Sequence, residues 1–355
     1  MYLDLVKIFL PTTVSFFLGI FITPFATHFF YKYKMWKKKP RNTDITSDAF
    51  KLIHHTKEET EISVPCVGGI IIWTSAFLSV FLFFLLSVVF PDSFSGLFEK
   101  LNFFSRSQTF IPIGMMALGA ILGLVDDLLE IRGKSEITRN SVWYTRGKIF
   151  IITILGMLAG IWFFYKLGMS SIHIPFDGAL ELGIFIIPFV IIVMLATFSG
   201  GVIDGLDGLS GGVLAAIFAA YSVIAFMNNQ IDLATFSGVL TGAILAFLWF
   251  NIPPARFYMG ETGMMPLTIT LATLAFLTDS VLVLPIIAMP LAATSLSSSI
   301  QLFSKKFFGR KVFRVAPLHH HFEALGWPSY KVTMRFWVLS IVFAIIGIIL
   351  TVVSR

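Results

Sequence analysis

The stretch IPIGMMALGAILGLVDDLLEIRGK, residues 111–134, begins as an unbroken apolar run and then becomes acidic. Its apolar part belongs to a segment of residues 109–125, and a helix needs about 17 to 25 such residues to cross the hydrocarbon core of a bilayer. Because no water reaches the backbone there, a segment that spans the core must be helical. Asp126 and Asp127 follow directly. The stretch therefore predicts a membrane helix with carboxylates at its end.

The rest of the 355-residue chain repeats the apolar part of this pattern. Hydrophobic residues make up 56% of the chain and charged residues 13%, whereas soluble domains carry about 25% charged residues. Ten segments are candidate spans: 9–30, 66–90, 109–125, 149–165, 182–198, 209–227, 233–250, 262–278, 280–303 and 336–354. The sequence predicts an all-α polytopic membrane protein with about ten transmembrane helices, in which residues 1–355 form a single membrane domain.

Two of these segments contain prolines that affect how they are interpreted. The first run contains Pro11 and Pro24 and is followed by further spans, so we expect an uncleaved helix and not a signal peptide. The segment 280–303 contains Pro285 and Pro290, and we expect it to be kinked or broken. Cys66 is the only cysteine, which excludes an internal disulfide.

Most of the positive charge falls on one face of this arrangement. If both termini are extracytoplasmic, the inward segments are 31–65, 126–148, 199–208, 251–261 and 304–335, and they hold 21 of the 26 Lys and Arg residues. Basic residues are enriched in cytoplasmic loops. We therefore expect extracytoplasmic termini, and we attribute most of these basic residues to orientation alone.

Carboxylates gather on the same inward face, which the rule of basic loops does not explain. They are Asp126, Asp127, Glu130, Asp204, Asp207 and Glu261. Acidic groups contribute little to orientation and are costly near hydrocarbon, so a group of them indicates a cation, a substrate or a proton. The alternative for GLVDDLLEIRGK (123–134) is a helix that ends in solvent, with its acids paired to Arg132 and Lys134.

Three further stretches carry candidate binding groups. GGVIDGLDGLSGG (200–212) contains two Asp-Gly pairs, which permit close backbone approach to a ligand but also suit a simple turn. NIPPARFYMGETG (251–263) combines an amide, an aromatic pair and Glu261, although aromatic residues near a bilayer surface are often belt residues. VAPLHHHFEALGW (315–327) contains three consecutive histidines in a long inward loop, and neighbours on a helix diverge too much to share one metal.

This set of groups favours phosphoryl transfer assisted by Mg²⁺. Oxygen ligands suit a hard cation, and Arg310, Lys311 and Arg314 add fixed positive charge beside the histidines. The metal would neutralise a diphosphate while a carboxylate positions or deprotonates the nucleophile. A site at the bilayer boundary indicates that one substrate is a lipid phosphate.

Together the four stretches closely resemble the phospho-N-acetylmuramoyl-pentapeptide transferase family, within the superfamily of polyprenyl-phosphate N-acetylhexosamine-1-phosphate transferases. The resemblance covers nearly the whole chain, and its most specific element is APLHHHFE (316–323) followed by GW (326–327) and RFW (335–337). It implies attack by undecaprenyl phosphate on the sugar-linked phosphate of UDP-MurNAc-pentapeptide, giving lipid I and UMP, a step of peptidoglycan biosynthesis. The implied cofactor is Mg²⁺, and the implied location is the bacterial inner membrane with the active site facing the cytoplasm.

The resemblance also implies roles for single residues. Asp126 corresponds to the proposed base, Asp127 to its acidic partner near the metal, and Asp207 is counted with the catalytic carboxylates. Glu261 and Asp127 are the expected metal ligands. The expected substrate-binding residues are Lys57, Asp204, Gly205, Leu206, Asn251, Tyr258, His319, His320 and His321.

Several positions depart from the family's pattern. Glu261 stands in place of Asp, which lengthens the arm by one methylene, and Gly201 and Ile203 replace Asn and Thr. An early motif is degraded: His54 and Lys57 match it only across extra residues before the run from Val64 to Gly69. Such departures also suit a paralogue with an altered substrate or reduced activity.

Two other functions remain open. A related transferase would use a UDP-N-acetylhexosamine as donor, and a non-catalytic transporter or lipid-binding protein would use neither. Transporters bind near the bilayer midplane on broken helices, whereas the charged residues here gather at one surface. No nucleic-acid partner is expected. The oligomeric state stays open, with a homodimer as one alternative.

Overall fold

A computed structural model of the chain describes residues 2–36, 63–91, 96–132 and 142–354, with the side chains of residues 142–145 excepted. The described helices and strands are α1 (Tyr2–Lys32), α4 (Ile70–Val89), α5 (Leu97–Leu101), α6 (Phe110–Ile131), α8 (Val142–Leu167), β1 (Ser171–Ile174), β2 (Gly178–Glu181), α9 (Ile186–Ser199), α10 (Leu209–Met227), α11 (Ile231–Asn251), α12 (Gly260–Leu277), α13 (Leu284–Ile287), α14 (Met289–Phe308), α15 (Leu318–Ala324) and α16 (Ser329–Val353). Short 3₁₀ turns precede and follow α9, at Gly183–Phe185 and Gly200–Ile203. The described part of the chain is helical, as expected, apart from one hairpin.

Eight helices among the described residues are long and apolar enough to cross a membrane. They correspond to eight of the ten expected spans, and they make the chain a multi-pass membrane protein. The expected spans 262–278 and 280–303 are not among them. The first corresponds to α12, in which Glu261, Pro266 and four threonines dilute the apolar character.

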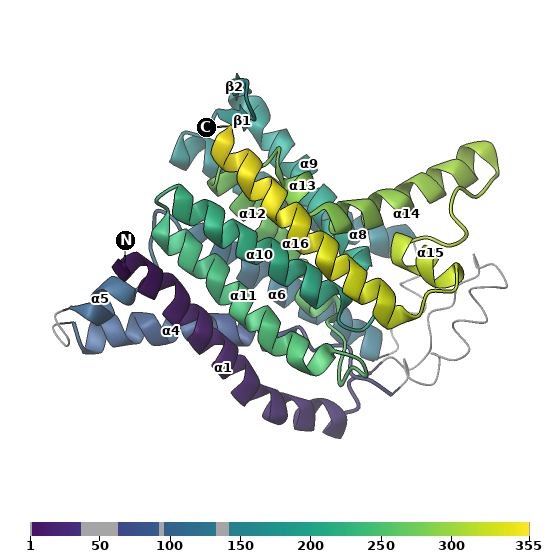
Figure 1. Cartoon of the computed structure of the whole chain (residues 1–355), viewed down its shortest axis with the longest axis horizontal. Coiled ribbons are helices and arrows are strands. Elements are labelled where there is room, and N and C mark those ends of the chain that lie inside the picture. The colour runs from purple at the N-terminus through teal and green to yellow at the C-terminus, as the bar shows by residue number, and fades with distance from the viewer. Residues whose placement is uncertain (1, 37–62, 92–95, 133–141, 355) are drawn as a thin grey trace.

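Burial explains this composition of α12, because nearly all of its residues lie inside the protein. A helix that touches other helices instead of lipid does not need a wholly apolar surface. The segment 280–303 is broken, as its prolines predicted: α13 ends at Ile287 and α14 begins at Met289. In Figure 1, α14 extends away from the bundle.

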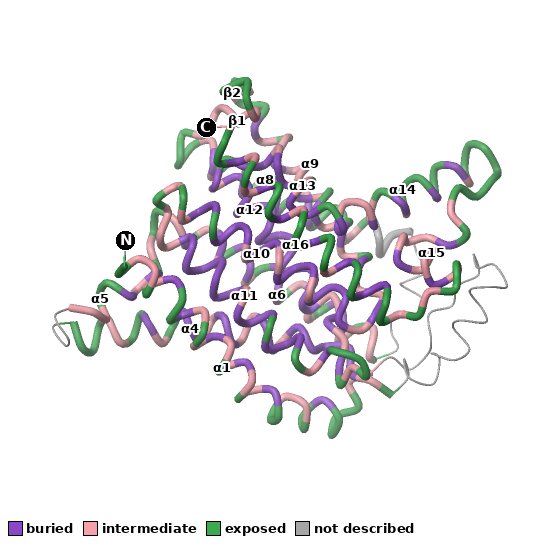
Figure 2. The backbone as a smooth tube through the Cα atoms, viewed as in Figure 1, coloured by how far each residue is buried: buried purple, intermediate pink, exposed green. Residues whose placement is uncertain are grey.

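The centre of the bundle is formed by α10, α11 and α12. In the membrane-length windows of α10 and α11, 72% and 78% of the residues are buried, against 22% in α1. Figure 2 shows the same contrast, with buried residues running along the central helices and exposed ones along α1 and α14. The peripheral helices therefore present the apolar surface that faces lipid.

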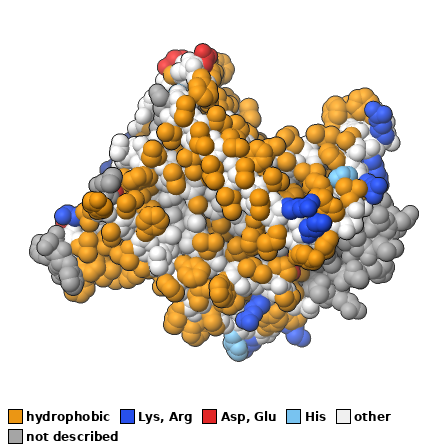
Figure 3. Space-filling model, viewed as in Figure 1, with side chains coloured by type: hydrophobic (Ala, Val, Ile, Leu, Met, Phe, Trp, Pro, Cys, Tyr) orange, Lys and Arg blue, Asp and Glu red, His pale blue; other side chains and the backbone are white. Residues whose placement is uncertain are grey.

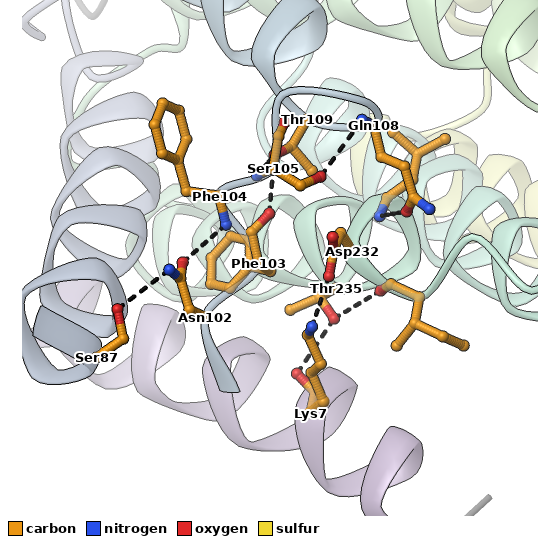
Figure 4. A network of polar contacts seen from close by, with 12 residues as sticks. Lys7, Ser87, Asn102, Phe103, Phe104, Ser105, Gln108, Thr109, Asp232 and Thr235 are labelled. Carbon is orange, nitrogen blue, oxygen red and sulfur yellow. Dashed lines mark hydrogen bonds and ion pairs between the residues drawn. The ribbon is translucent and has the colours of Figure 1, made fainter. Parts of the chain in front are cut away.

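The two ends of the bundle carry different groups. The start of α1 and the end of α16 lie toward the same end in Figure 1. At that end Lys7 Nζ lies 2.6 Å from Asp232 Oδ1 (Figure 4), and His173 Nε2 lies 3.1 Å from the Ser354 carbonyl oxygen. At the opposite end, the last turn of α6 meets the start of α12, and Asn251 of α11 and Trp337 of α16 both contact Gly208.

The end near the termini also carries a feature that the sequence did not predict. Strands β1 and β2 pair in antiparallel fashion, with Ser171 opposite Glu181 and Ile174 opposite Gly178. Figure 3 shows acidic side chains at this tip and Lys and Arg side chains over α14 and α15, at the other end. The charge asymmetry expected from the sequence is thus present along the bundle.

Candidate active site

Helix α12 begins inside the site, and side chains from other elements bind its first backbone N–H groups. Gly260 has φ +66°, which glycine adopts without steric cost, and its N–H donates to Asp204 Oδ2 at 3.1 Å. The N–H groups of Glu261 and Thr262 donate to Asp127 Oδ1 and Oδ2 at 3.3 and 2.8 Å. A helix leaves its first four N–H groups without partners in the helix. Asp127 and Asp204 therefore fix where α12 starts.

Asp127 is held in this role by burial and by a second contact. Only 2% of the residue is exposed, and the Thr262 hydroxyl donates to Asp127 Oδ2 at 2.6 Å. Helix α6 passes very close to α12 here, since a Cβ on Gly123 would lie 2.2 Å from the Glu261 carbonyl oxygen. Asp126 is buried as well. The interpretation that these two acids end the helix in solvent is therefore wrong.

Lys148, in the second turn of α8, joins two of the expected acidic residues. Its Nζ donates to Asp126 Oδ2 at 2.7 Å and to Glu261 Oε1 at 3.2 Å. The side chains of Lys148 and Asp126 are 19% and 9% exposed, and that of Glu261 is 33% exposed. Carboxylates from α6 and α12 thus converge on one ammonium group from α8.

Lys148 is not among the residues predicted from the sequence, because little in the sequence distinguishes it. It is one of the many basic residues on the inward face, all of which the orientation rule explains equally well. Only its place at the start of an apolar run sets it apart.

The two Asp-Gly pairs form a loop that packs against the start of α12. Ser210 Oγ donates to Asp204 Oδ1 at 2.7 Å, and the Ala255 N–H donates to Asp207 Oδ2 at 3.1 Å. Leu206, expected in the nucleotide pocket, is buried. Asn251 also holds the loop, because its Oδ1 accepts the Gly208 N–H at 2.9 Å.

The Asn251 amide is a structural clip in this structure. Its Nδ2 donates to the Phe257 carbonyl oxygen at 2.7 Å, and the residue is 3% exposed. Phe257 is wholly buried against Phe30, Phe247 and Phe250, so it offers no platform to a ligand. Its neighbour Tyr258 is partly exposed, which leaves Tyr258 as the candidate for stacking.

The remnant of the early motif lies at the same place. Tyr258 N–H donates to the Pro65 carbonyl oxygen at 2.8 Å, and the N–H groups of Gly68 and Gly69 donate to the carbonyl oxygens of Tyr258 and Met259 at 2.8 and 3.0 Å. The segment is therefore part of the site despite its altered sequence. His54 and Lys57 lie outside the described residues.

The histidine block reaches the Asp-Gly loop from α15. A Cβ on Gly205 would lie 2.4 Å from His319 Nε2 and 3.1 Å from His320 Nε2, so both rings pack directly on this glycine. His319 is wholly buried. His320 Nδ1 lies 2.7 Å from Glu323 Oε2. The block thus stands beside Asp204 and Asp207 in space, although more than 100 residues separate them in sequence.

His321 points in another direction, as expected for consecutive residues on a helix. Its Nδ1 accepts the Arg314 N–H at 3.2 Å. Burial, and then the positive charge of Arg314, lower the pKa of His321 below its usual value. A neutral ring suits its role as acceptor.

Helix α16 holds the Asp-Gly loop from the other side. Trp337 Nε1 donates to the Gly208 carbonyl oxygen at 3.0 Å, and Thr333 Oγ1 donates to the Asp207 carbonyl oxygen at 3.2 Å. Arg335 lies 4.1 Å from the centre of the Trp327 ring. These contacts give physical roles to the GW and RFW elements that marked the resemblance.

The carboxylates of the site are the type of ligand that a hard cation binds. Among the described residues, no group of three or more His, Cys, Asp or Glu side chains is arranged as a metal site. Asp126 and Glu261 nevertheless converge on one positive charge, and carboxylate oxygens are the ligands that Mg²⁺ accepts. These two residues fit a divalent cation, whereas Asp127 also binds the start of α12.

Comparisons with known proteins identify relatives of this chain. The model of "Glycosyl transferase family 4" matches residues 109–279, from α6 to α12. A phospho-N-acetylmuramoyl-pentapeptide-transferase of Anoxybacillus flavithermus is 35% identical over 81% of this chain and 84% of its own. One from Chloroflexus aggregans is 30% identical over 99% of this chain and 91% of its own, and one from Caldanaerobacter subterraneus is 31% identical over 95% and 96%.

Proposed function

Because this chain belongs to glycosyl transferase family 4 and is homologous to phospho-N-acetylmuramoyl-pentapeptide transferases over nearly its whole length, we propose that it makes lipid I. It would transfer phospho-MurNAc-pentapeptide from UDP-MurNAc-pentapeptide to undecaprenyl phosphate and release UMP. The convergence of Asp126 and Glu261 beside the Asp-Gly loop and the histidine block carries the proposal. Carboxylates, the Lys148 ammonium and the Asp-Gly loop thus lie together at one end of the helix bundle.

The reaction exchanges one phosphate linkage for another. An oxygen of the carrier phosphate forms a bond to the sugar-linked phosphorus, and the bond between that phosphorus and the UMP oxygen breaks. Asp126 would receive or orient the proton of the carrier phosphate, because its buried carboxylate faces the same space as Glu261. A positioned base of this kind contributes about 100- to 10,000-fold to a rate.

Mg²⁺, held by Glu261 with Asp126 or Asp127, would neutralise charge on the diphosphate when bound. Asp127 has a second task that the structure supports, since it fixes the start of α12 and thereby the position of Glu261. Asp207 would complete the set of catalytic carboxylates from the neighbouring loop.

The donor would lie across the Asp-Gly loop. Gly205 lets the rings of His319 and His320 pack directly on the loop, where they could contact the donor, and Tyr258 offers a partly exposed ring for the base. Asp204, Leu206 and Asn251 would shape the pocket mainly by fixing the loop. Lys57 and His321 complete the proposed substrate-binding residues.

The carrier explains why the site lies at a bilayer boundary. Its phosphate would reach the carboxylates while its apolar chain stays among the helices. We place the site on the cytoplasmic side of the bacterial inner membrane, because the basic segments gather at that end and the described chain ends lie at the other.

A comparison of two donors tests the proposal. Purified protein in detergent with Mg²⁺ and undecaprenyl phosphate should release UMP from UDP-MurNAc-pentapeptide and not from UDP-N-acetylglucosamine. Release from the smaller donor alone would assign the chain to a related hexosamine transferase. No UMP from either donor, in protein that binds Mn²⁺ and melts cooperatively, would support a non-catalytic role.

A further inference from the structure

A single ammonium group sits between two carboxylates at the centre of the site. Lys148 Nζ lies 2.7 Å from Asp126 Oδ2 and 3.2 Å from Glu261 Oε1. The three side chains come from three helices, α8, α6 and α12, so this contact fixes how the acids lie relative to each other. Counted by formal charge, the three side chains have one excess negative charge.

The position of this group makes an ordinary structural ion pair an incomplete explanation. One lysine and one carboxylate would be enough to neutralise charge near hydrocarbon, as Lys7 and Asp232 do at the far end of the bundle (Figure 4). Here a second carboxylate, that of Glu261, contacts the ammonium too. The backbone N–H of Glu261 also donates to Asp127. Two like charges so close together destabilise each other unless a cation lies between them.

The ammonium and a divalent cation compete for this position. Both are attracted to the same pair of carboxylates, and they repel each other at short range with an energy that rises as water is excluded. A cation can bind both acids only after Lys148 has moved. An anionic diphosphate beside the site would supply a new partner for the displaced ammonium.

On the basis of the proposed function, we propose that Lys148 is a positioning residue that takes the place of the divalent cation between Asp126 and Glu261 while no donor is bound. The exchange makes cation binding depend on the arrival of the diphosphate. Lys148 holds the two acids in position without a metal, and it disfavours metal binding while the site is open to water.

Binding of free Mn²⁺ to the full-length protein in detergent, measured by electron paramagnetic resonance without nucleotide, tests the proposal. Lys148→Met removes the competing charge, and the half-saturating concentration of Mn²⁺ should fall by on the order of tenfold or more. The matched control is Lys7→Met, which removes a paired lysine of similar side-chain exposure, 17% against 19%, at the other end. This control should bind Mn²⁺ as the wild type does.

Two more variants separate charge from packing. Lys148→Gln keeps a hydrogen-bond donor without the charge and should resemble Lys148→Met, whereas Lys148→Arg keeps the charge and should resemble the wild type. A lysine with a purely structural role would lower the melting temperature of all three variants and leave Mn²⁺ affinity unchanged. Unchanged or weaker Mn²⁺ binding in both uncharged variants overturns the proposal.

A second series adds UDP as a diphosphate probe and reads its effect on Mn²⁺ binding. UDP should strengthen Mn²⁺ binding more in the wild type than in Lys148→Met, because only the wild type has an ammonium to displace. If UDP does not bind at all, the proposed function fails while the competition between Lys148 and the cation still stands. An equal effect of UDP in both proteins would contradict the dependence on donor.

Discussion

Two adjacent carboxylates on α6 make different contacts in the structure. Asp126 faces Lys148 and Glu261, whereas Asp127 is turned into the start of α12, where it accepts two N–H groups and one hydroxyl. Neighbours on a helix point about 100° apart. One of them therefore faces Lys148 and Glu261, and the other meets the backbone at the start of α12.

Replacement of Asp127 by Asn should therefore reduce stability as well as activity. An amide offers one acceptor oxygen and turns an NH₂ group toward backbone donors, which costs about 1 to 3 kcal/mol for a buried group. We expect Asp127→Asn to unfold at a lower temperature than the wild type in detergent, while Asp126→Asn unfolds close to it. Equal melting temperatures for Asp127→Asn and the wild type would show that the contact with α12 is not a cap.

The contact between Gly205 and the histidine rings gives a second prediction at this scale. Gly205→Ala places a methyl group where the rings of His319 and His320 lie, so α15 must shift. A displacement of about 1 Å costs on the order of 100-fold in rate, and we expect such a loss of UMP release.

Gly201→Ala is the matched control for this change. The nearest atom to its new Cβ is Met264 Cβ, at 3.8 Å, which is an ordinary contact. It should keep wild-type turnover. Equal activity of the two variants would mean that the block does not act at Gly205.

The sequence was informative about which residues meet and less so about what each one does. It placed Asp126, Asp204, Asp207 and Glu261 at one boundary because acids near hydrocarbon are costly and need a reason. It did not predict that Asn251 joins two loops by hydrogen bonds, since an amide can bond equally well to a ligand and to the backbone. Lys148 was missed for a related reason, because its charge is ordinary in an inward loop and only its partners are unusual.

At the scale of the elements, the close crossing of α6 and α12 positions the site. Gly123 allows the two helices to approach until a Cβ would touch the Glu261 carbonyl oxygen. Gly123→Ala should push the start of α12 away from Asp127, at a cost of about 1 to 3 kcal/mol for overpacking.

Measurements of thermal unfolding and UMP release, with Gly114→Ala as control, test this prediction. Gly114 lies on the same helix, and a Cβ there meets no atom within 4 Å. Only Gly123→Ala should lower both the melting temperature and the rate of UMP release. A wild-type result for Gly123→Ala would show that α12 tolerates the shift and that the crossing does not set the geometry.

The elements also show where patterns of hydropathy succeed and where they fail. Eight spans and the break before α14 follow from run length and proline positions. The segment of α12 was expected as one of ten candidate spans, yet its buried threonines and Glu261 belong to a helix enclosed by others. The hairpin of β1 and β2 was missed, because its eight paired residues carry no alternating pattern strong enough to predict strands.

At the scale of the whole molecule, we expect the site to face the cytoplasm and the hairpin to face outside. Single cysteines in a Cys66→Ser background test this orientation with a membrane-impermeant maleimide on spheroplasts. Glu181→Cys, on the exposed strand β2, should be labelled at once. Lys311→Cys, in the basic segment between α14 and α15, should be labelled only after the membrane is permeabilised, and the reverse pattern would invert the proposed topology.

The central claim is that acids of separate helices transfer a sugar phosphate to a lipid, and release of UMP from UDP-MurNAc-pentapeptide measures it most directly. With Mg²⁺ present, the wild type should release UMP only when undecaprenyl phosphate is added, and Asp126→Asn should be slower by about 100-fold or more. Release that does not require the lipid, or a wild-type rate in Asp126→Asn, would contradict the account.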